Sequence, residues 1–293
     1  MKRHGVDVFT YPTPEEFIDS LLLHKAHQPV FVLVYNETYS KFYDPRRIES
    51  AIRTHWPDAV IFNSTKTGKI LRDKRRLNTF LRKEGIGVPA MVESETSTTK
   101  TLSNAAIGSH KPVVVYDVGE PLDHDRYNTA FINTVREYSG KTYYVCLRAL
   151  AVSTKLVSVY VRARPTDDGD PSVHSRDTPV DADLINHLYR EVAAPNTPRI
   201  ENLCYQLGRV LGPGFYAHDI LPCTDTGRLL VCESGFKFND NTLRKHLLSI
   251  GRELPFSDLF TDEEALRAAE AFLTVVRNDD ATASFPVNRT VQQ

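Results

Sequence analysis

Residues 215–233 read FYAHDILPCTDTGRLLVCE, and this stretch is the starting point for the fold. Two apolar runs flank the turn-forming sequence TDTG, a pattern that predicts an antiparallel hairpin. With the turn centred on Thr226, Asp219 lies directly opposite Glu233, because the turn position sets the pairing register. The other residues expected on that face are apolar. They are Ala217, Leu221, Leu229 and Val231.

Two carboxylates that oppose each other across a sheet repel, and an apolar surface adds a desolvation penalty. A bound cation would remove both costs. Because every donor is an oxygen atom, the pair favours Mg²⁺ or Mn²⁺ over zinc. The alternative is a loop one residue shorter. It would place Asp219 and Glu233 on opposite faces and leave Glu233 in an ordinary salt bridge.

Three arginines lie on two strand-like runs that precede this hairpin, at residues 142–150 and 156–164. A turn between the runs places Arg148, Arg162 and Arg164 on one face. Guanidinium groups bind phosphate oxygens through paired hydrogen bonds, so this face is a candidate phosphate site. The equally open alternative is a solvated edge at which the arginines pair with acidic residues of the following loop. Those residues are Asp167, Asp168 and Asp170.

The first 90 residues alternate between strand and helix patterns, which is typical of a parallel sheet flanked by helices. A capping box with proline at the first helical position marks the first helix. The run at 30–35 is continuously apolar and predicts a strand covered on both faces. The expected strands are 6–10, 30–35 and 59–63, and the expected helices begin at Thr13 and cover 46–56 and 73–84.

The rest of the chain mixes strands, loops and helices. Residues 93–110 are rich in Ser and Thr and predict a mobile loop or part of a lid. Residues 165–181 are rich in Pro and Asp and predict a long exposed loop. Residues after Asn278 are polar and are expected to fray. The remaining expected elements are a strand at 112–116 and helices at 182–193, 199–211, 242–252 and 262–277.

The composition of the 293 residues is that of an ordinary globular chain, with 41% hydrophobic and 25% charged residues. Lys and Arg total 36 against 37 Asp and Glu, so the formal net charge is -1. Binding nucleic acid needs a basic excess, and a membrane span needs roughly 20 apolar residues in a row. Neither is visible, and no secretory signal is visible. We therefore expect a cytoplasmic protein with no nucleic-acid and no membrane partner, and the sequence leaves a homodimer open.

The four cysteines form no CxxC pair, and most lie in apolar surroundings. This favours reduced core thiols over disulfides or a zinc site. They are Cys146, Cys204, Cys223 and Cys232.

Two other patterns are less informative than they look. TGK at 67–69 is similar to part of a phosphate-binding P-loop, but Asn63 replaces its first glycine and Ile70 replaces its Ser or Thr. His218 adjoins Asp219 but lies on the opposite face of the strand by alternation, which favours a packing role.

Several motifs occur in a definite order along the chain. DK at 73–74 begins a helix that leads to GIGVP at 85–89, which alone would indicate only a capped, charged surface helix. YVCLR at 144–148 is followed by VR at 161–162, and in the hairpin GFYAHDI precedes GRLLVCE. Together these motifs resemble the ATP-grasp superfamily, especially its small amino-acid and peptide ligases. The resemblance covers more than half of the chain.

The resemblance implies a mixed fold of α/β and α+β parts. A small N-terminal parallel-sheet α/β domain at 1–72 would precede an ATP-grasp-like pair of α+β subdomains. The pair would comprise a lid-like subdomain at 73–135 and a C-terminal subdomain at 136–278, with a flexible tail at 279–293. ATP would lie between the two subdomains and phosphorylate a substrate carboxylate. An amine would then displace the phosphate.

The resemblance also implies roles for individual residues. Asp219 and Glu233 would hold Mg²⁺, or Mn²⁺, on the nucleotide phosphates, with Asn239 as a further ligand. Arg148 and Arg162 would be catalytic, because they would stabilise the transferring phosphoryl group. The residues expected to bind ATP are Lys74, Lys111, Arg148 and Arg162.

The sequence departs from the family pattern at three places. Tyr116 stands where the family usually has a lysine at the end of the lid strand, and Lys111 lies at the beginning of that strand. The glycine-rich lid loop is missing unless residues 93–110 replace it. Gly235 stands where the family has an asparagine after the metal-binding Glu. Residues that could take that role are Lys237, Asn239 and Asp240.

Three functions therefore compete. The first is an ATP- and Mg-dependent ligase that joins a small-molecule acid to an amine, of the amino-acid or peptide type or in natural-product biosynthesis. The second is a catalytically degenerate ATP-grasp protein that binds a nucleotide or a partner. The third is a different phosphoryl transfer, such as a carboxylate or sugar kinase. The sequence does not identify the acid or the amine.

Overall fold

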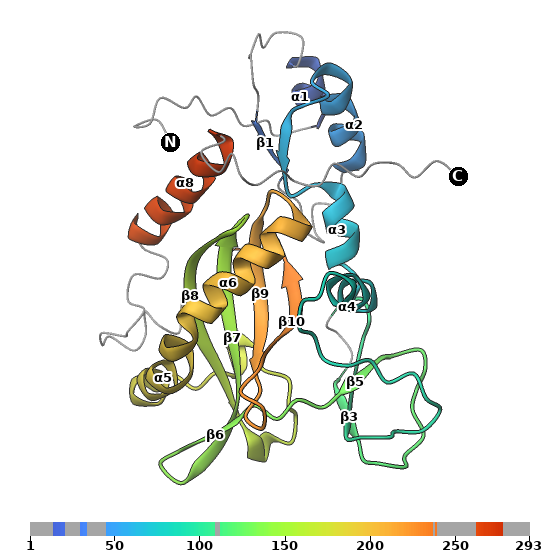
Figure 1. Cartoon of the computed structure of the whole chain (residues 1–293), viewed down its shortest axis with the longest axis vertical. Helices are drawn as coiled ribbons and strands as arrows, with labels where there is room; N and C mark the ends of the chain where they lie inside the picture. The colour runs from blue at the N-terminus through green and yellow to red at the C-terminus, as the bar shows by residue number, and fades with distance from the viewer. Residues whose placement is uncertain are drawn as a thin grey trace.

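The computed structural model describes residues 14–20, 30–33, 45–108, 112–236, 238 and 262–277. It shows a mixed fold with one parallel sheet and two antiparallel sheets (Figure 1). The expected strand at 6–10, the helix at 242–252 and the residues after 278 lie outside the described residues. The proposed domain boundaries stay a prediction.

The N-terminal part contains α1 (Pro14–Ser20), β1 (Val30–Val32), α2 (Pro45–His55) and β2 (Val60–Phe62). β1 and β2 pair in parallel, which confirms the sheet type predicted from the alternation. The buried side chains of Ile52 and Ile61 belong to one small core. Burial of β1 on both faces was the wrong expectation, because Val32 is 38% exposed.

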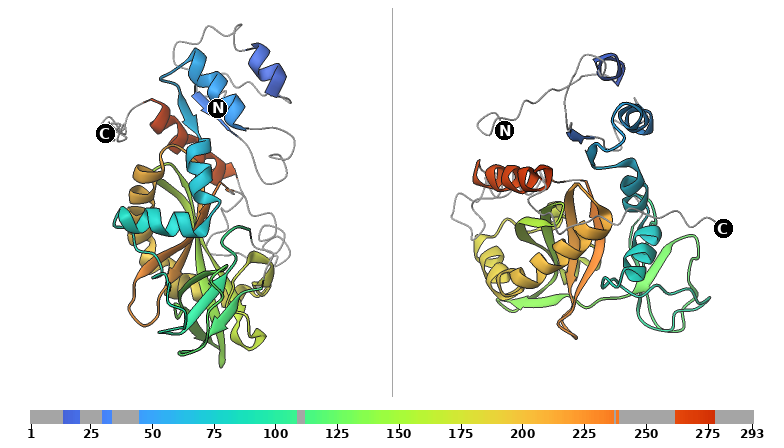
Figure 2. Two further views of the ribbon diagram at one scale, coloured as in Figure 1. Left: turned by 90° about the vertical axis from the view of Figure 1, so that its right-hand side faces the viewer. Right: turned by 45° about the horizontal axis from the view of Figure 1, so that its top comes forward.

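Two helices connect this part to the rest of the chain. α3 (Thr65–Leu71) was not predicted and contains the TGK sequence. It begins at Ser64, whose side chain accepts a hydrogen bond from the Thr67 amide, as an N-cap does. α4 (Lys74–Lys83) begins in the same way at Asp73. Both helices pack against β10 at the edge of the main sheet (Figure 2).

A three-stranded antiparallel sheet follows, in the order β4-β3-β5. Its strands are β3 (Thr101–Asn104), β4 (Val114–Tyr116) and β5 (Tyr127–Ala130). The Ser/Thr-rich segment thus contains a strand, so its reading as an aperiodic mobile loop was wrong for 101–104. Its hydroxyl groups can be buried because they bond internally: Ser97 Oγ lies 2.7 Å from Thr101 Oγ1.

The main sheet is antiparallel and has the order β10-β9-β7-β6, with β8 also paired to β7. The strands are β6 (Val135–Tyr138), β7 (Lys141–Val152), β8 (Lys155–Pro165), β9 (Phe215–Pro222) and β10 (Leu229–Gly235). Two short 3₁₀ turns, Thr166–Asp168 and Ser175–Asp177, interrupt the segment after β8.

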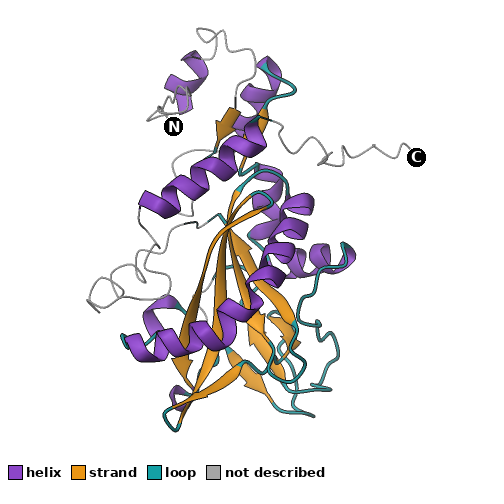
Figure 3. Ribbon diagram, turned by 60° about the vertical axis from the view of Figure 1, so that its left-hand side comes forward, coloured by secondary structure: helices purple, strands orange, loops and turns teal. Residues whose placement is uncertain are grey.

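Helices α5 (Ala182–Leu188) and α6 (Ala194–Leu211) cover one face of this sheet (Figure 3). The expected helices, 182–193 and 199–211, leave a break at 194–198, but α6 covers these residues and a π-helical turn, Tyr189–Ala193, joins it to α5. Pro195 lies at the start of α6, directly after this π-helical turn, and Pro198 lies inside the helix. Residues of both helices and of β7, β8 and β9 form the largest hydrophobic core.

α8 (Asp262–Val276) packs at the end of the sheet near β2. Its Phe272 ring lies 4.8 Å from the ring of Phe62 and 5.9 Å from that of Phe215. The N-terminal and C-terminal segments therefore share a core with the main sheet. No helix among the described residues is long and apolar enough to cross a membrane.

The contact between α6 and the β7–β8 turn provides a test of the packing. A Cβ atom at Gly208 would lie 2.2 Å from the Ser153 carbonyl oxygen. Gly208→Ala in a helix ordinarily stabilises by about 0.5–1 kcal/mol, but overpacking here should reverse the sign and cost about 1–3 kcal/mol. Urea unfolding should show this loss for Gly208→Ala and not for Asn202→Ala, an exposed position on the same helix. Equal or greater stability of Gly208→Ala would contradict the packing.

Candidate functional site

The hairpin of β9 and β10 brings the two predicted carboxylates together. Asp219 lies directly opposite Glu233, which confirms the predicted pairing. Nearer the turn, however, Val231 pairs with Ile220, one residue out of the predicted register. A β-bulge between Val231 and Glu233 absorbs the extra residue, Cys232.

The bulge also changes which side chains share the carboxylate face. Val231 lies in the main core together with Ile220, and Leu229 packs against that same core. The expectation that Val231 and Leu229 flank the carboxylates was therefore wrong. Because strand side chains alternate, one extra residue moves everything on the turn side of the bulge to the other face.

The three arginines share one face, as the turn between β7 and β8 predicted. Tyr160 pairs with Arg148, Cys146 with Arg162, and Tyr144 with Arg164. Arg148 also lies directly opposite Asp219 on the neighbouring strand β9. Three adjacent strands therefore place two arginines beside one aspartate.

Asp219 is the common partner of these two arginines. Its Oδ1 atom lies 2.7 Å from Arg162 Nη2 and 3.2 Å from Arg148 Nη1. The exposed fractions of the side chains are 4% for Arg162, 12% for Arg148 and 18% for Asp219. Burial by itself would raise the pKa of Asp219, but the two guanidinium groups hold it below its ordinary value. Asp219 in turn keeps the pKa of Arg162 well above the ordinary value despite burial.

Lys74 joins the site from the first turn of α4. Its Nζ atom lies 3.8 Å from Glu233 Oε2 and donates a hydrogen bond of 3.0 Å to the Gly108 carbonyl oxygen. Lys74 is buried, whereas the Glu233 side chain is 45% exposed. The backbone amide of Lys74 also bonds to the Ala106 carbonyl oxygen at 2.9 Å. The start of α4 is thus tied to both β10 and the segment after β3.

We call Lys74, Arg148, Arg162, Asp219 and Glu233 the mixed-charge cluster. It contains three cationic groups and two carboxylates, so one positive charge is in excess. Such a set fits an anion with several oxygen atoms, which can accept hydrogen bonds from guanidinium and ammonium groups.

The donor set of the cluster fits a metal ion only together with a ligand. The described residues contain no group of three or more His, Cys, Asp or Glu side chains that could hold one. Mg²⁺, however, is commonly bound by one or two carboxylates together with substrate phosphates. Asp219 and Glu233 therefore fit Mg²⁺ that is also held by the oxygen atoms of a polyphosphate.

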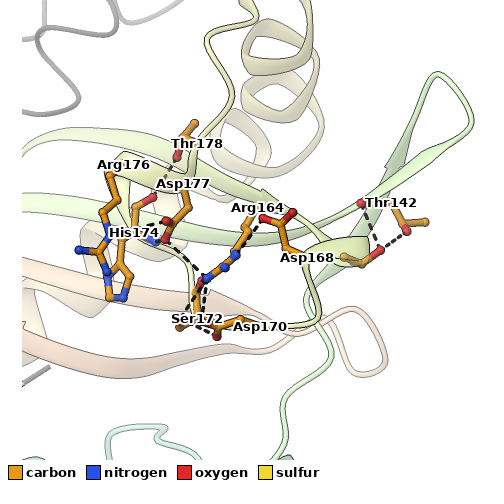
Figure 4. A network of polar contacts seen from close by, with 10 residues as sticks. Thr142, Arg164, Asp168, Asp170, Ser172, His174, Arg176, Asp177 and Thr178 are labelled. Carbon is orange, nitrogen blue, oxygen red and sulfur yellow. Dashed lines mark hydrogen bonds and ion pairs between the residues drawn. The ribbon is translucent and has the colours of Figure 1, made fainter. Parts of the chain in front are cut away.

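Arg164 has a different role from its neighbours. It forms ion pairs with Asp168 at 3.2 Å, Asp170 at 2.8 Å and Asp177 at 3.8 Å (Figure 4). It also donates a 3.1 Å hydrogen bond to the Ser172 carbonyl oxygen. The alternative of pairing with acidic loop residues thus holds for Arg164, and the loop after β8 is folded around it.

This folded loop brings His174 toward the cluster, a placement that sequence patterns did not reveal. Thr178 Oγ1 accepts a hydrogen bond from the Ala163 amide and donates one to the His174 carbonyl oxygen. Burial and the charge of Arg162 lower the pKa of His174, opposed by Asp177. No local pattern could have indicated this residue, because its position depends on the ion pairs of Arg164.

The remaining predicted residues divide into three groups. Lys111 and Asn239, together with Lys237 and Asp240, lie outside the described residues. Tyr116 ends β4 opposite Thr101, and Gly235 ends β10 opposite Ala217. The four cysteines are free, three of them buried, as predicted for reduced core thiols.

His218 has the packing role that alternation indicated. Its ring stacks on Tyr216 at 5.4 Å, and its Nδ1 atom lies 2.8 Å from Ser234 Oγ. Burial lowers the pKa of His218 to about 3, so the ring is neutral at ordinary pH.

Comparisons with known proteins give similarity at the level of structure. No family model and no curated protein matches the sequence. Among solved structures, the chain is similar to the ATP-grasp ligase PsnB complexed with a phosphomimetic variant of minimal precursor, Mg and ADP. The TM-score is 0.46 and the identity 10%, over 84% of this chain and 79% of that chain.

Two further solved structures are similar. D-alanine–D-alanine ligase from Bacillus anthracis has a TM-score of 0.48 and 13% identity, over 92% of this chain and 87% of that one. N5-carboxyaminoimidazole ribonucleotide synthetase from Thermotoga maritima has a TM-score of 0.41 and 14% identity, over 83% of this chain and 62% of that one. Because these scores and identities are low, function has to be argued from the residues of the site.

Proposed function

We propose that this chain binds ATP and Mg²⁺ at the mixed-charge cluster and is an ATP-dependent ligase of the ATP-grasp type. It would activate a carboxylate as an acyl phosphate and join it to an amine. The observation that supports this proposal is the convergence of two arginines, a buried lysine and two carboxylates from β7, β8, β9, β10 and α4.

Each residue of the cluster has a definite task in this proposal. Arg148, Arg162 and Lys74 bind phosphate oxygens and neutralise the charge of the group in transfer. Asp219 and Glu233 hold Mg²⁺, which when bound supplies further charge neutralisation. Arg148 lies on the central strand β7 and Arg162 on β8, which pairs with β7. Only 12% and 4% of their side chains are exposed, so they are held in place before the substrate arrives.

The chemistry needs no covalent bond to the protein. A carboxylate oxygen attacks the terminal phosphorus atom, and the bond from phosphorus to the leaving ADP oxygen breaks. The amine nitrogen then attacks the acyl carbon, the carbon–oxygen bond to phosphate breaks, and the nitrogen loses a proton. Throughout, Arg148 and Arg162 face the negative charge that moves from the nucleotide to the released phosphate.

A second candidate is a catalytically degenerate protein of the same fold that binds the nucleotide without ligation. The observation that favours it is Tyr116, which ends the lid-like strand β4 where a lysine would be expected. A phenol cannot supply the positive charge that a lysine would bring to the phosphates.

Thermal unfolding with and without Mg·ATP tests the nucleotide site. A ligand at 100 times its Kd should add about 2.7 kcal/mol to the free energy of unfolding. At roughly 2–4 °C per kcal/mol, the Tm should rise by at least several degrees. Glu233→Gln should lose the Mg-dependent part of this shift, whereas Glu201→Gln, an exposed site on α6, should keep it. An unchanged shift in Glu233→Gln would exclude Glu233 as a metal ligand.

Removal of the buried ammonium group tests the phosphate contact. Lys74→Met should weaken ATP binding about 10- to 150-fold, the equivalent of one hydrogen bond to a charged group. Calorimetric titration measures this change. Lys83→Met, at an exposed position of the same helix, serves as the control and should bind ATP like the wild type. Equal affinities of the two variants would place the phosphates elsewhere.

Release of ADP separates the two candidate functions. With Mg·ATP, a mixture of amino acids as carboxylates and hydroxylamine as the amine, a ligase should release ADP and form a hydroxamate in a carboxylate-dependent manner. A phosphate ester without hydroxamate would instead indicate a kinase that acts on a hydroxyl group, such as a sugar kinase. Tight ATP binding without any ADP release, over a broad panel of acids and peptides, would favour the degenerate protein.

A further inference from the structure

We propose that the mixed-charge cluster binds the polyphosphate of ATP before it binds Mg²⁺. Before ATP binds, ion pairs with the arginines and Lys74 occupy the two carboxylates, so free Mg²⁺ does not bind. Phosphate oxygens then replace the carboxylates as partners of these cationic groups. This inference rests on the proposed nucleotide site and adds to it the sequence in which nucleotide and metal enter.

The first reason for this order is that Asp219 is already paired with two arginines. Both arginines contact the same atom, Oδ1, at 2.7 and 3.2 Å. A metal ion at this carboxylate would lie beside two guanidinium groups that repel it. Mg²⁺ also gives up its water reluctantly and demands near-octahedral geometry. Coordination by two carboxylates whose charge is already neutralised would not offset the cost of removing water from Mg²⁺.

Burial makes these ion pairs hard to break without a replacement. Breaking a buried pair leaves an uncompensated charge, which is strongly unfavourable. Arg162 is almost fully buried, so it needs an acceptor at all times. A phosphate oxygen is such an acceptor, and a free metal ion is not.

The present pairing is nevertheless incomplete. The Nε atom of Arg162 is buried and has no hydrogen-bond partner among the described residues. A buried donor without a partner is costly, so this guanidinium group gains from a ligand that brings several oxygen atoms. Among the described residues, Glu233 forms an ion pair with Lys74 at 3.8 Å, and its side chain is 45% exposed. It can therefore turn to a metal ion once Lys74 contacts a phosphate.

The sequence of events follows from these contacts. Phosphate oxygens accept hydrogen bonds from Arg148, Arg162 and Lys74. Oxygen atoms of Asp219 and Glu233 become free at the same time, next to the phosphates. Mg²⁺ then finds two carboxylates and phosphate oxygens together. Because binding is reciprocal, Mg²⁺ must tighten ATP binding by the same factor by which ATP tightens Mg²⁺ binding.

Isothermal titration calorimetry of the full chain tests this order with three probes: MgCl₂ alone, ATP with EDTA, and ATP with MgCl₂. We expect no saturable binding of MgCl₂ alone, saturable binding of ATP in EDTA, and tighter binding of ATP with Mg²⁺. Sodium tripolyphosphate in EDTA should compete with ATP, because the cluster recognises the phosphate chain.

Variants assign each step to its residues. Asp219→Asn should bind ATP in EDTA within about threefold of wild type or more tightly, because it removes the group that competes for the arginines, and it should lose the effect of Mg²⁺. Arg148→Gln should weaken binding of ATP in EDTA about 10- to 150-fold. Arg82→Gln, at an exposed position on α4, is the control. Glu233→Gln gives the same test of the metal step if Asp219→Asn does not fold.

The outcomes separate this inference from the proposed function. Saturable binding of MgCl₂ alone that Glu233→Gln abolishes would overturn the order. Binding of ATP only in the presence of Mg²⁺ would also overturn it but would leave the nucleotide site intact. Absence of ATP binding under both conditions would reject the proposed function and the inference with it.

Discussion

The structure depends on how three buried charges on neighbouring strands compensate one another. Asp219 on β9 lies against Arg148 on β7 and Arg162 on β8, and none of the three side chains has much contact with solvent. A charge in such surroundings is tolerated only when it is paired and hydrogen-bonded. The face of the main sheet that carries these charges also carries the buried side chains of Leu150, Tyr160 and Ala217, and the opposite face packs into the largest hydrophobic core.

A single extra residue in β10 lets this strand contribute to both the apolar core and the ionic contacts. The bulge at Cys232 allows Val231 to pack into the apolar core and still leaves Glu233 opposite Asp219. In a regular strand, residues 231 and 233 would share one face. Bulges are found next to functional sites because they redirect a side chain in this way. Here the bulge lets a short strand contribute both to the core and to the mixed-charge cluster.

Arg162 and Arg164 show how position alone distinguishes two identical side chains on one strand face. Arg162 meets Asp219 in the middle of the sheet, whereas Arg164 at the strand end is surrounded by Asp168, Asp170 and Asp177. In the proposed function, Arg162 exchanges Asp219 for a phosphate oxygen. Arg164 instead stays paired with the acidic residues of the loop after β8, which is folded around it. The carboxylates of this loop that pair with Arg164 therefore have a structural role and do not form a free acidic surface.

The sequence by itself determined the hairpin, the Asp219–Glu233 pair and the common face of the arginines. Alternation and turn position are local properties, and they set which residues of adjacent strands meet. Only the tertiary structure decided the bulge at Cys232, the strand inside the Ser/Thr-rich segment and the ion pair of Lys74 with Glu233. These features depend on residues distant in sequence: α4 must pack against β10 before Lys74 can meet Glu233. Such contacts follow from the packing of whole elements, which no local pattern encodes.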